Sequence, residues 1–276
     1  MRIFLMIVPL MWALQVAVTR AAETEETLFE VLQVSRLLTV LQAEAVASGL
    51  DLAMDMSGSD ARDPGWREVV AGINDPAVVG PRMLDDFSDA LPDENLPAIL
   101  EFWQSPDGQE IVALEMSARE ALLDPDVAAH VMERFDGVAE DGTARTAQLQ
   151  EFIAVNNLIE SNVLGAMNAN AAFLRGLRQG APLRDLAPGT DSGILMEVWS
   201  QEPEIRLATV AWLYGYLSLA YQPLSDDDLN GYIAFSASDA GQAFNAALFL
   251  AFDRMFVRTS LETGEALARH LTSEDI

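Results

Sequence analysis

The chain lacks two residue types on which much enzyme chemistry depends. Among its 276 residues there is no cysteine, and all 16 basic residues are arginine, so lysine is absent as well. The missing cysteines exclude disulfides, cysteine-bound zinc, iron–sulfur clusters, thiol nucleophiles and a lipidated N-terminal cysteine. The missing lysines exclude a phosphate-binding P-loop lysine, a Schiff base and a serine–lysine dyad.

Positive charge and histidine are also scarce. The arginines face 43 acidic residues, and the formal net charge is −27. Duplex nucleic acids are bound largely through basic side chains, so we expect no nucleic-acid partner. The two histidines, His130 and His270, lie far apart in the sequence. The acidic cluster Asp226–Asp228 lacks the spacing of a calcium loop and is expected to cap a helix. We therefore expect neither a metal nor another cofactor.

The N-terminus has the layout of a secretory signal peptide. Arg2 precedes an apolar run over residues 3–18, and a small residue, Ala21, precedes the expected cut. The run is shorter than the roughly 20 residues of a spanning helix and is interrupted by Pro9, so we expect cleavage and not an uncleaved anchor. Residues 1–21 are interpreted as a cleaved signal, which predicts a periplasmic protein with no stable membrane insertion.

The apolar residues of the rest of the chain recur at three- and four-residue steps, the spacing of an amphipathic helix. Residues 27–56 show this clearly and are predicted to be a long helical region, and residues 149–178 are predicted to form a long helix. Acid–proline pairs mark further helix starts, because proline is tolerated in the first turn. These pairs are Asp63-Pro64, Asp75-Pro76, Asp124-Pro125 and Glu202-Pro203. The sequence predicts an all-α fold of about ten helices.

Two segments 133 residues apart read alike. Residues 91–109 are LPDENLPAILEFWQSPDGQ and residues 224–242 are LSDDDLNGYIAFSASDAGQ, with seven identities in 19 ungapped positions. Each contains the pattern Phe-x-x-Ser-x-x-Gly-Gln and follows a longer helical region. We interpret this as a tandem duplication. It divides the chain after the signal into two related helical halves, residues 22–137 and 138–276, which we expect to pack as one compact unit.

The shared pattern is expected to build a helix corner. Its defining residues are Phe102, Ser105, Gly108 and Gln109 in the first copy and Phe235, Ser238, Gly241 and Gln242 in the second. The serine would cap the helix that follows, and the phenylalanine would fill the corner. The glycine has no Cβ and would let the preceding helix approach closely. We favour this structural role over a functional site formed by serine and glutamine.

The paired segments resemble the domain of unknown function 2059 (DUF 2059), a family of exported helical proteins of Gram-negative bacteria. The stretch Leu96–Gln109 carries the closer likeness. The resemblance implies an all-α periplasmic protein and implies no particular reaction.

Asparagine is unusually frequent in the second of the two long predicted helices, although its side chain competes there for backbone hydrogen bonds. One interpretation is a buried hydrogen-bond network that fixes helix register, and the other is a ligand-binding stripe. Arg206 and Asn245, each on another apolar helix, are candidate partners. The candidate binding residues are Asn156, Asn157, Glu160, Asn168 and Arg206.

Glu160 also suggests an enzyme, because Ser161 follows it. Lytic transglycosylases, which are helical enzymes that cleave peptidoglycan, carry a catalytic Glu-Ser pair, and one carboxylic acid with a raised pKa can serve there as acid and base. The sequence lacks the segment that should follow this pair. We predict a non-enzymatic binding or interaction module of the cell envelope with an envelope protein or glycan as partner, and a glycan-cleaving enzyme using Glu160 is the alternative.

Aromatic residues gather over residues 199–221, namely Trp199, Trp212, Tyr214, Tyr216 and Tyr221. Large aromatic side chains contribute much buried area, so we expect them in the core between the halves. An exposed groove for a partner helix or glycan is the alternative. Residues 241–257 are apolar almost all round and are expected to form a central buried helix.

Overall fold

The computed structural model describes residues 24–57, 64–133, 142–180 and 189–274. Within these ranges all regular structure is helical and no strand occurs, which confirms the predicted all-α class. Twelve α-helices and one 3-10 turn have assigned bounds, and residues 24–31 form a further helical stretch. The expected number of about ten helices is therefore too low. The signal peptide predicted over residues 1–21 lies outside the described residues.

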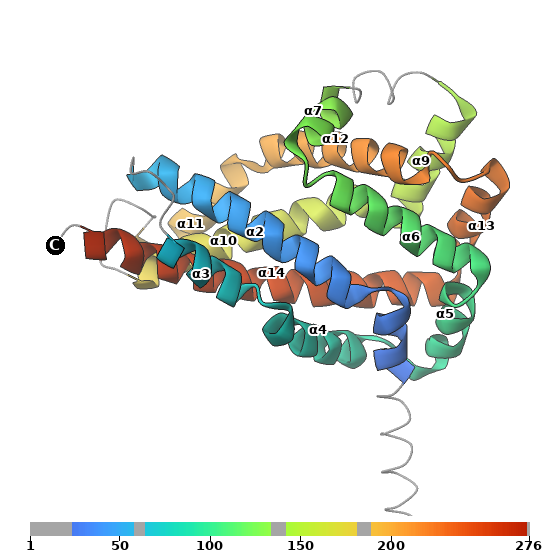
Figure 1. Cartoon of the computed structure of the whole chain (residues 1–276), viewed down its shortest axis with the longest axis horizontal. Coiled ribbons are helices and arrows are strands. Elements are labelled where there is room, and N and C mark those ends of the chain that lie inside the picture. Colours follow the sequence, from blue (N-terminus) through green and yellow to red (C-terminus); the bar gives the residue numbers. More distant parts are fainter. Residues whose placement is uncertain (1–23, 58–63, 134–141, 181–188, 275–276) are drawn as a thin grey trace, which may run out of the picture.

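The helices that follow one another along the chain range from 8 residues in α5 to 36 residues in α14 (Figure 1). The first half contains α2 (Val34–Ser57), α3 (Pro64–Ile73), α4 (Pro76–Ala90), η1 (Asp93–Asn95), α5 (Leu96–Trp103), α6 (Pro106–Ala121) and α7 (Pro125–Glu133). The second half contains α9 (Ala144–Val155), α10 (Leu158–Gly180), α11 (Asp191–Ser200), α12 (Glu202–Tyr221), α13 (Asp226–Ala237) and α14 (Asp239–Glu274).

Helix α14 runs through the middle of the assembly along its long axis (Figure 1). It packs most extensively against α10 and also against α4, α3, α5 and α13. The main hydrophobic core draws on both halves, with Phe87 and Trp103 from the first and Tyr221, Leu229 and Phe244 from the second. The two halves therefore share one core.

The proline-based helix starts are confirmed. Helices α3, α4 and α7 begin at Pro64, Pro76 and Pro125, and α12 begins one residue before Pro203. At α4, Oδ1 of Asp75 accepts a hydrogen bond from the amide of Ala77 at 2.9 Å. The carboxylate thereby satisfies one of the amides that have no partner inside the helix.

Both long helical regions are interrupted, and the prediction of one helix over residues 149–178 is wrong at this point. Gln33 has a φ of 54° and Asn157 a φ of 50°, both in the left-handed region. A left-handed residue cannot continue a right-handed helix. Helices α2 and α10 therefore begin just after these residues, at Val34 and Leu158.

Helix α2 also contains the described stretch that is long and apolar enough to cross a membrane by length and composition alone, Val34–Met54. In this structure, α2 packs against α3, α4 and α6. Leu38, Val40 and Val46 are buried within the assembly. The stretch thus serves here as one wall of a helical bundle.

The repeated pattern forms a corner between consecutive helices in both halves. Oγ of Ser105 accepts the amide of Gly108 at 3.1 Å, and Oγ of Ser238 accepts the amide of Gly241 at 3.1 Å. A Cβ on Gly108 would lie 2.3 Å from the carbonyl oxygen of Phe102, and a Cβ on Gly241 would meet the equivalent carbonyl of Phe235 at 2.1 Å. Both corners therefore need a residue without a Cβ.

The glutamine of each pattern ties its corner to the helix break of the same half. Nε2 of Gln109 donates to the carbonyls of Trp103 (2.7 Å) and Val31 (3.3 Å), and Val31 lies just before the Gln33 break. Nε2 of Gln242 donates to the carbonyls of Ser236 (2.6 Å) and Val155 (3.0 Å), just before the Asn157 break. The two corners meet where the rings of Phe102 and Phe235 stack, with centroids 3.8 Å apart and planes 1° from parallel.

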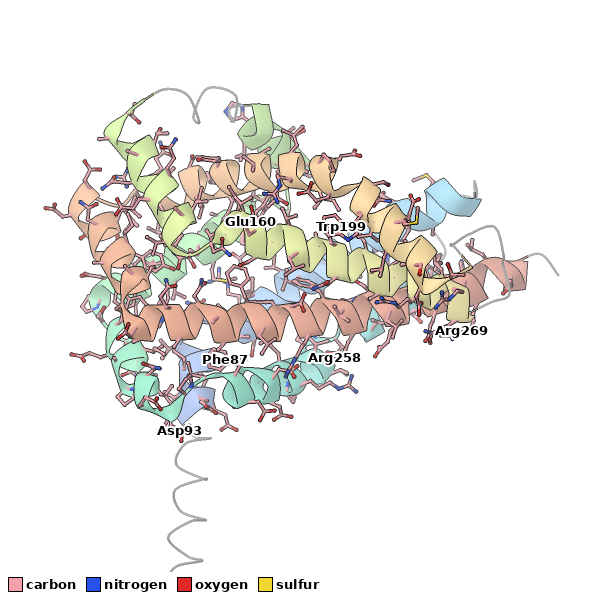
Figure 2. The ribbon with its side chains drawn as sticks, turned by 180° about the vertical axis from the view of Figure 1, so that it is seen from behind. Phe87, Asp93, Glu160, Trp199, Arg258 and Arg269 are labelled. Carbon is pink, nitrogen blue, oxygen red and sulfur yellow. The ribbon has the colours of Figure 1, made fainter. Side chains whose placement is uncertain are left out.

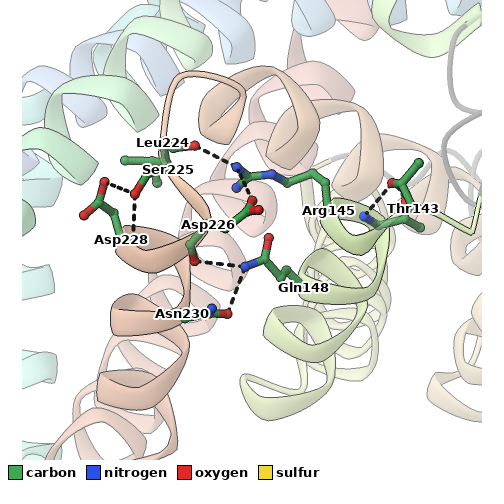
Figure 3. Close-up of polar contacts among 9 residues, drawn as sticks. Thr143, Arg145, Gln148, Leu224, Ser225, Asp226, Asp228 and Asn230 are labelled. Carbon is green, nitrogen blue, oxygen red and sulfur yellow. Dashed lines mark hydrogen bonds and ion pairs between the residues drawn. The ribbon is translucent and has the colours of Figure 1, made fainter.

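A polar junction fixes α13 against α9 (Figure 3). Nη2 of Arg145 donates to the carbonyl of Leu224 at 2.7 Å and pairs with Asp226 at 2.9 Å. Oγ of Ser225 accepts the amide of Asp228 at 3.2 Å and donates to its carboxylate at 2.6 Å. Ser225 is thus the cap of α13, and the acidic cluster occupies the first turn of the helix, where Asp228 bonds to the capping serine.

Candidate functional site

A cavity of about 490 Å³ lies between α2 on one side and α10 and α14 on the other. Helix α2 packs against α3, α4 and α6, whereas α10 packs mainly against α14, α12 and α11. The space left between these two groups of helices is open on one side. Its volume falls in the range of small-molecule sites in proteins. We call it the α2–α14 cleft.

The walls of the cleft are mainly apolar. Helix α2 lines it with residues at helical spacing from Leu38 to Leu52, which places them on one face. Phe173 and Leu174 of α10 and Met255 of α14 line the other side. An apolar molecule in this space would be removed from water on several sides.

The polar residues of the lining carry no formal charge. Nε2 of Gln42 donates to the carbonyl of Ala71 at 2.7 Å, and Nδ2 of Asn74 donates to that of Val70 at 2.9 Å. Oγ1 of Thr263 donates to the carbonyl of Thr259 at 2.7 Å. Among the described residues that line the cleft none is ionisable, although the whole chain has a net charge of −27. The lining therefore favours an uncharged ligand.

Glycines hold α10 and α14 close together at one end of the cleft. A Cβ on Gly176 would lie 2.1 Å from the carbonyl oxygen of Leu261, and one on Gly264 would lie 2.2 Å from that of Phe173. The two backbones are in direct contact there, and only glycine permits this distance. The α10–α14 wall of the cleft is thus held together by a close contact between the two backbones.

Glu160 lies on α10 beside α12 (Figure 2) and is not among the residues that line the cleft. Its carboxylate accepts two hydrogen bonds from Arg206 of α12, at 2.5 and 2.9 Å, and its side chain is 60% exposed. The hydrogen bonds from Arg206 lower the pKa of Glu160 below its usual value. A general acid needs a raised pKa, so this environment does not favour Glu160 as a proton donor.

The asparagines predicted beside Glu160 are distributed over different contacts. Asn156 is 5% exposed and its carbonyl accepts a hydrogen bond from Nδ2 of Asn245 at 2.9 Å. Asn157 is the left-handed residue between α9 and α10. Nδ2 of Asn168 donates to Asp253 of α14 at 2.9 Å. Both suggested partners thus contact the predicted segment 149–178, with Asn245 bonded to Asn156 and Arg206 paired with Glu160. The candidate residues do not form one continuous stripe.

The expected core position of the aromatic residues holds for Tyr221, which is 1% exposed, and is wrong for Trp199. Trp199 is 66% exposed on α11, and Met196 of the same helix is 74% exposed (Figure 2). The aromatic content of the segment alone could not separate the two positions.

His270 stacks on Trp66 with centroids 5.3 Å apart. Within the described ranges, no group of three or more histidine and acidic side chains is placed to hold a metal ion.

The residues of the cleft were not identified from the sequence. They come from α2, α3, α4, α10 and α14 and from the turn before α12, so no continuous motif contains them. Comparisons with protein-family models, curated proteins and solved structures found no match to this chain. The geometry and chemistry of the cleft therefore carry the functional argument.

Proposed function

We propose that this protein is a non-enzymatic binding protein of the cell envelope that holds an uncharged, mainly apolar small molecule in the α2–α14 cleft. The observation that carries the proposal is the lining, a space of about 490 Å³ in which the described residues are apolar or uncharged. Each methylene group transferred from water into such a space contributes about 0.8 kcal/mol. A ligand with several methylene groups would gain enough affinity without any ion pair.

The proposed location in the periplasm rests on the N-terminal pattern of Arg2, an apolar run and a small residue before the expected cut. The resemblance to the exported family named above supports the same location. A strongly acidic surface also suits a protein that carries an apolar ligand and must stay soluble. The proposed tandem duplication is supported by the matching hydrogen bonds of the two corners.

The alternative of a glycan-cleaving enzyme has less support. Its proposed acid, Glu160, is exposed and paired with Arg206, and its pKa is lowered. A peptidoglycan digestion assay with wild-type protein and Glu160→Gln separates the two proposals. We expect no cleavage by either protein, and lysis by wild type that disappears in the variant would establish the enzyme.

The binding proposal is tested by titrating the purified full chain with N-phenyl-1-naphthylamine, an uncharged fluorophore that brightens in apolar surroundings. We expect saturable binding of one molecule per chain. Lipid extraction of protein purified from envelope, followed by mass spectrometry, would identify the natural ligand. A linear fluorescence increase without saturation would contradict a specific site.

A further inference from the structure

A second cavity, of about 120 Å³, lies further along α2 and α14, where these helices meet α5, α6, α12 and α13. The residues that line it include Trp103, Glu115, Arg119, Tyr216, Tyr232 and Phe244. We call it the Glu115 cavity. It differs from the cleft in containing a carboxylate, a guanidinium group and several hydrogen-bonding aromatic side chains.

Glu115 is held by three tyrosines of the second half of the chain. The hydroxyls of Tyr221 and Tyr232 donate to the same carboxylate oxygen, Oε1, at 2.6 and 3.3 Å. The hydroxyl of Tyr216 donates to the main-chain carbonyl of Glu115 at 3.2 Å. Enclosure by protein atoms raises the pKa of Glu115, and the two hydrogen bonds to its carboxylate oppose that shift.

The carboxylate has hydroxyl partners but forms no ion pair with any of the described residues. Arg119 lies one turn along the same helix, but its Nη2 atom pairs with Glu44 at 2.5 Å. The guanidinium group also lies over the ring of Trp212, 5.0 Å from its centroid. An enclosed carboxylate without a countercharge is costly when ionised, so a ligand with a positive group would be stabilised beside it.

Two hydrogen-bond donors of the lining have no partner in the described chain. Trp103 is 2% exposed, and its indole nitrogen is buried without a hydrogen bond. Nε of Arg119 is likewise buried and unpaired. Leaving such a donor unsatisfied is costly, and native proteins rarely do so. Both nitrogens are closed to a molecule of the size of water, so a ligand carboxylate would reach them only when neighbouring side chains shift, and it would then supply the missing acceptor.

Aromatic rings complete the wall between these groups. The ring of Trp103 lies 5.6 Å from that of Tyr232 and 5.5 Å from that of Phe244, centroid to centroid. Aromatic faces attract ammonium groups, especially alkylated ones. The same cavity therefore offers an acidic and aromatic environment for a cation together with two donors for an anion.

We propose that the Glu115 cavity binds a small zwitterion, with its ammonium group toward Glu115 and the aromatic rings and its carboxylate toward the N–H groups of Trp103 and Arg119. A simple cation would face the guanidinium group of Arg119, and a simple anion would face Glu115. A zwitterion avoids both repulsions. This site does not depend on the function proposed for the α2–α14 cleft.

The test is isothermal titration calorimetry of the full chain at constant ionic strength. The probes are glycine betaine and free glycine as zwitterions, tetramethylammonium chloride as the cation, and sodium acetate as the anion. We expect saturable binding of at least one zwitterion, about tenfold or more tighter than binding of either single ion. Equal or tighter binding of tetramethylammonium or acetate, or no saturable binding of any probe, would overturn the proposal.

Two variants locate the binding. Glu115→Gln removes the charge and keeps an oxygen for the tyrosines, and Trp103→Phe keeps a ring and removes the N–H group. Each should weaken zwitterion binding about tenfold or more. Glu110→Gln, at an exposed position of the same helix, is the matched control and should bind like wild type. If Glu115→Gln or a folded Trp103→Phe protein bound the zwitterion as tightly as wild type, the assignment would be wrong.

Discussion

The α2–α14 cleft and the Glu115 cavity occupy consecutive stretches of the same two helices but have opposite chemistry. The Glu115 cavity is lined by residues within 32–37, around the start of α2, and within 244–252 of α14. The cleft is lined by residues within 38–52 of α2 and within 255–263 of α14. Both helices contribute apolar side chains to both spaces, and α14 adds the uncharged polar residues Thr259, Ser260 and Thr263 to the cleft. The charge in the Glu115 cavity comes from α6, which packs against α12 and does not line the cleft. The helix that packs beside this shared pair, α6 at the Glu115 cavity and α10 at the cleft, thus decides which ligand each space can accept.

Placing a charge in the cleft should have the largest effect. Ser260→Asp introduces a carboxylate into an uncharged lining, where burying it without a partner is costly. We expect binding of N-phenyl-1-naphthylamine to weaken by about 10- to 100-fold in a fluorescence titration. Ser117→Asp, at an exposed position of α6, is the control and should bind normally. Zwitterion binding should be unchanged in both variants.

Filling the cleft should have a smaller effect. Ala45→Phe adds a ring that points from the lining face of α2 into the space that the ligand would occupy. We expect the affinity for the same fluorophore to fall by about tenfold, the loss of one to two buried methylene contacts. Ala43→Phe, on an exposed position of the same helix, matches the change in size and should leave binding intact. Equal losses in the two variants would place the fluorophore elsewhere.

The two cavities should also differ in how pH affects them. Burial raises the pKa of Glu115 above the ordinary value of 4.5, so its charged form is less favourable in the folded protein than in the unfolded chain. Its contribution to the free energy of unfolding is present below pH 4.5 and is lost as the pH rises through the folded-state pKa. The free energy of unfolding, measured in urea, should fall less between pH 5 and pH 7.5 in Glu115→Gln than in wild type. Glu110→Gln should follow wild type, and a parallel loss in all three proteins would contradict the raised pKa.

The smallest expected effect concerns the two corners, which hold the helices of both cavities. Ser105→Ala and Ser238→Ala each remove a cap that accepts an amide at 3.1 Å. Each should lower the free energy of unfolding by about 1 kcal/mol, measured in urea. Fluorophore binding should persist in both variants at conditions where they are folded. A large loss of unfolding free energy in only one of the two variants would show that the serine does not have the same role in both corners.

The local features of this fold were predictable because they depend on neighbouring residues. The acid–proline pairs of this chain, such as Asp75-Pro76, lie at helix starts, and a serine three residues before a glycine amide can cap a helix. Asn157 tolerates the left-handed conformation and could have indicated the break at α10, whereas Gln33 gives no such signal. The breaks and the corners together direct α2 and α10 away from the preceding helical stretches.

The cavities were not predictable because they depend on contacts between distant segments. Glu115 lies in an ordinary acidic stretch of α6, and Tyr221 and Tyr232 lie 106 and 117 residues further along the chain. The same holds for Glu160 and Arg206, whose contact over 46 residues could be suggested but not placed. Periodicity assigns a residue to a helix face, but only the packing of helices decides whether that face meets a cavity, a partner or solvent.

The most direct test of the central proposal is a titration of N-phenyl-1-naphthylamine into wild-type protein and Ser260→Asp, at pH 6 and pH 8. The described lining of the cleft contains no ionisable group, so we expect saturable one-site binding to wild type with the same affinity at both pH values. The variant should have lost most of that affinity. Non-saturable binding to wild type, or equal affinity in the variant, would contradict a binding site for an uncharged ligand in the α2–α14 cleft.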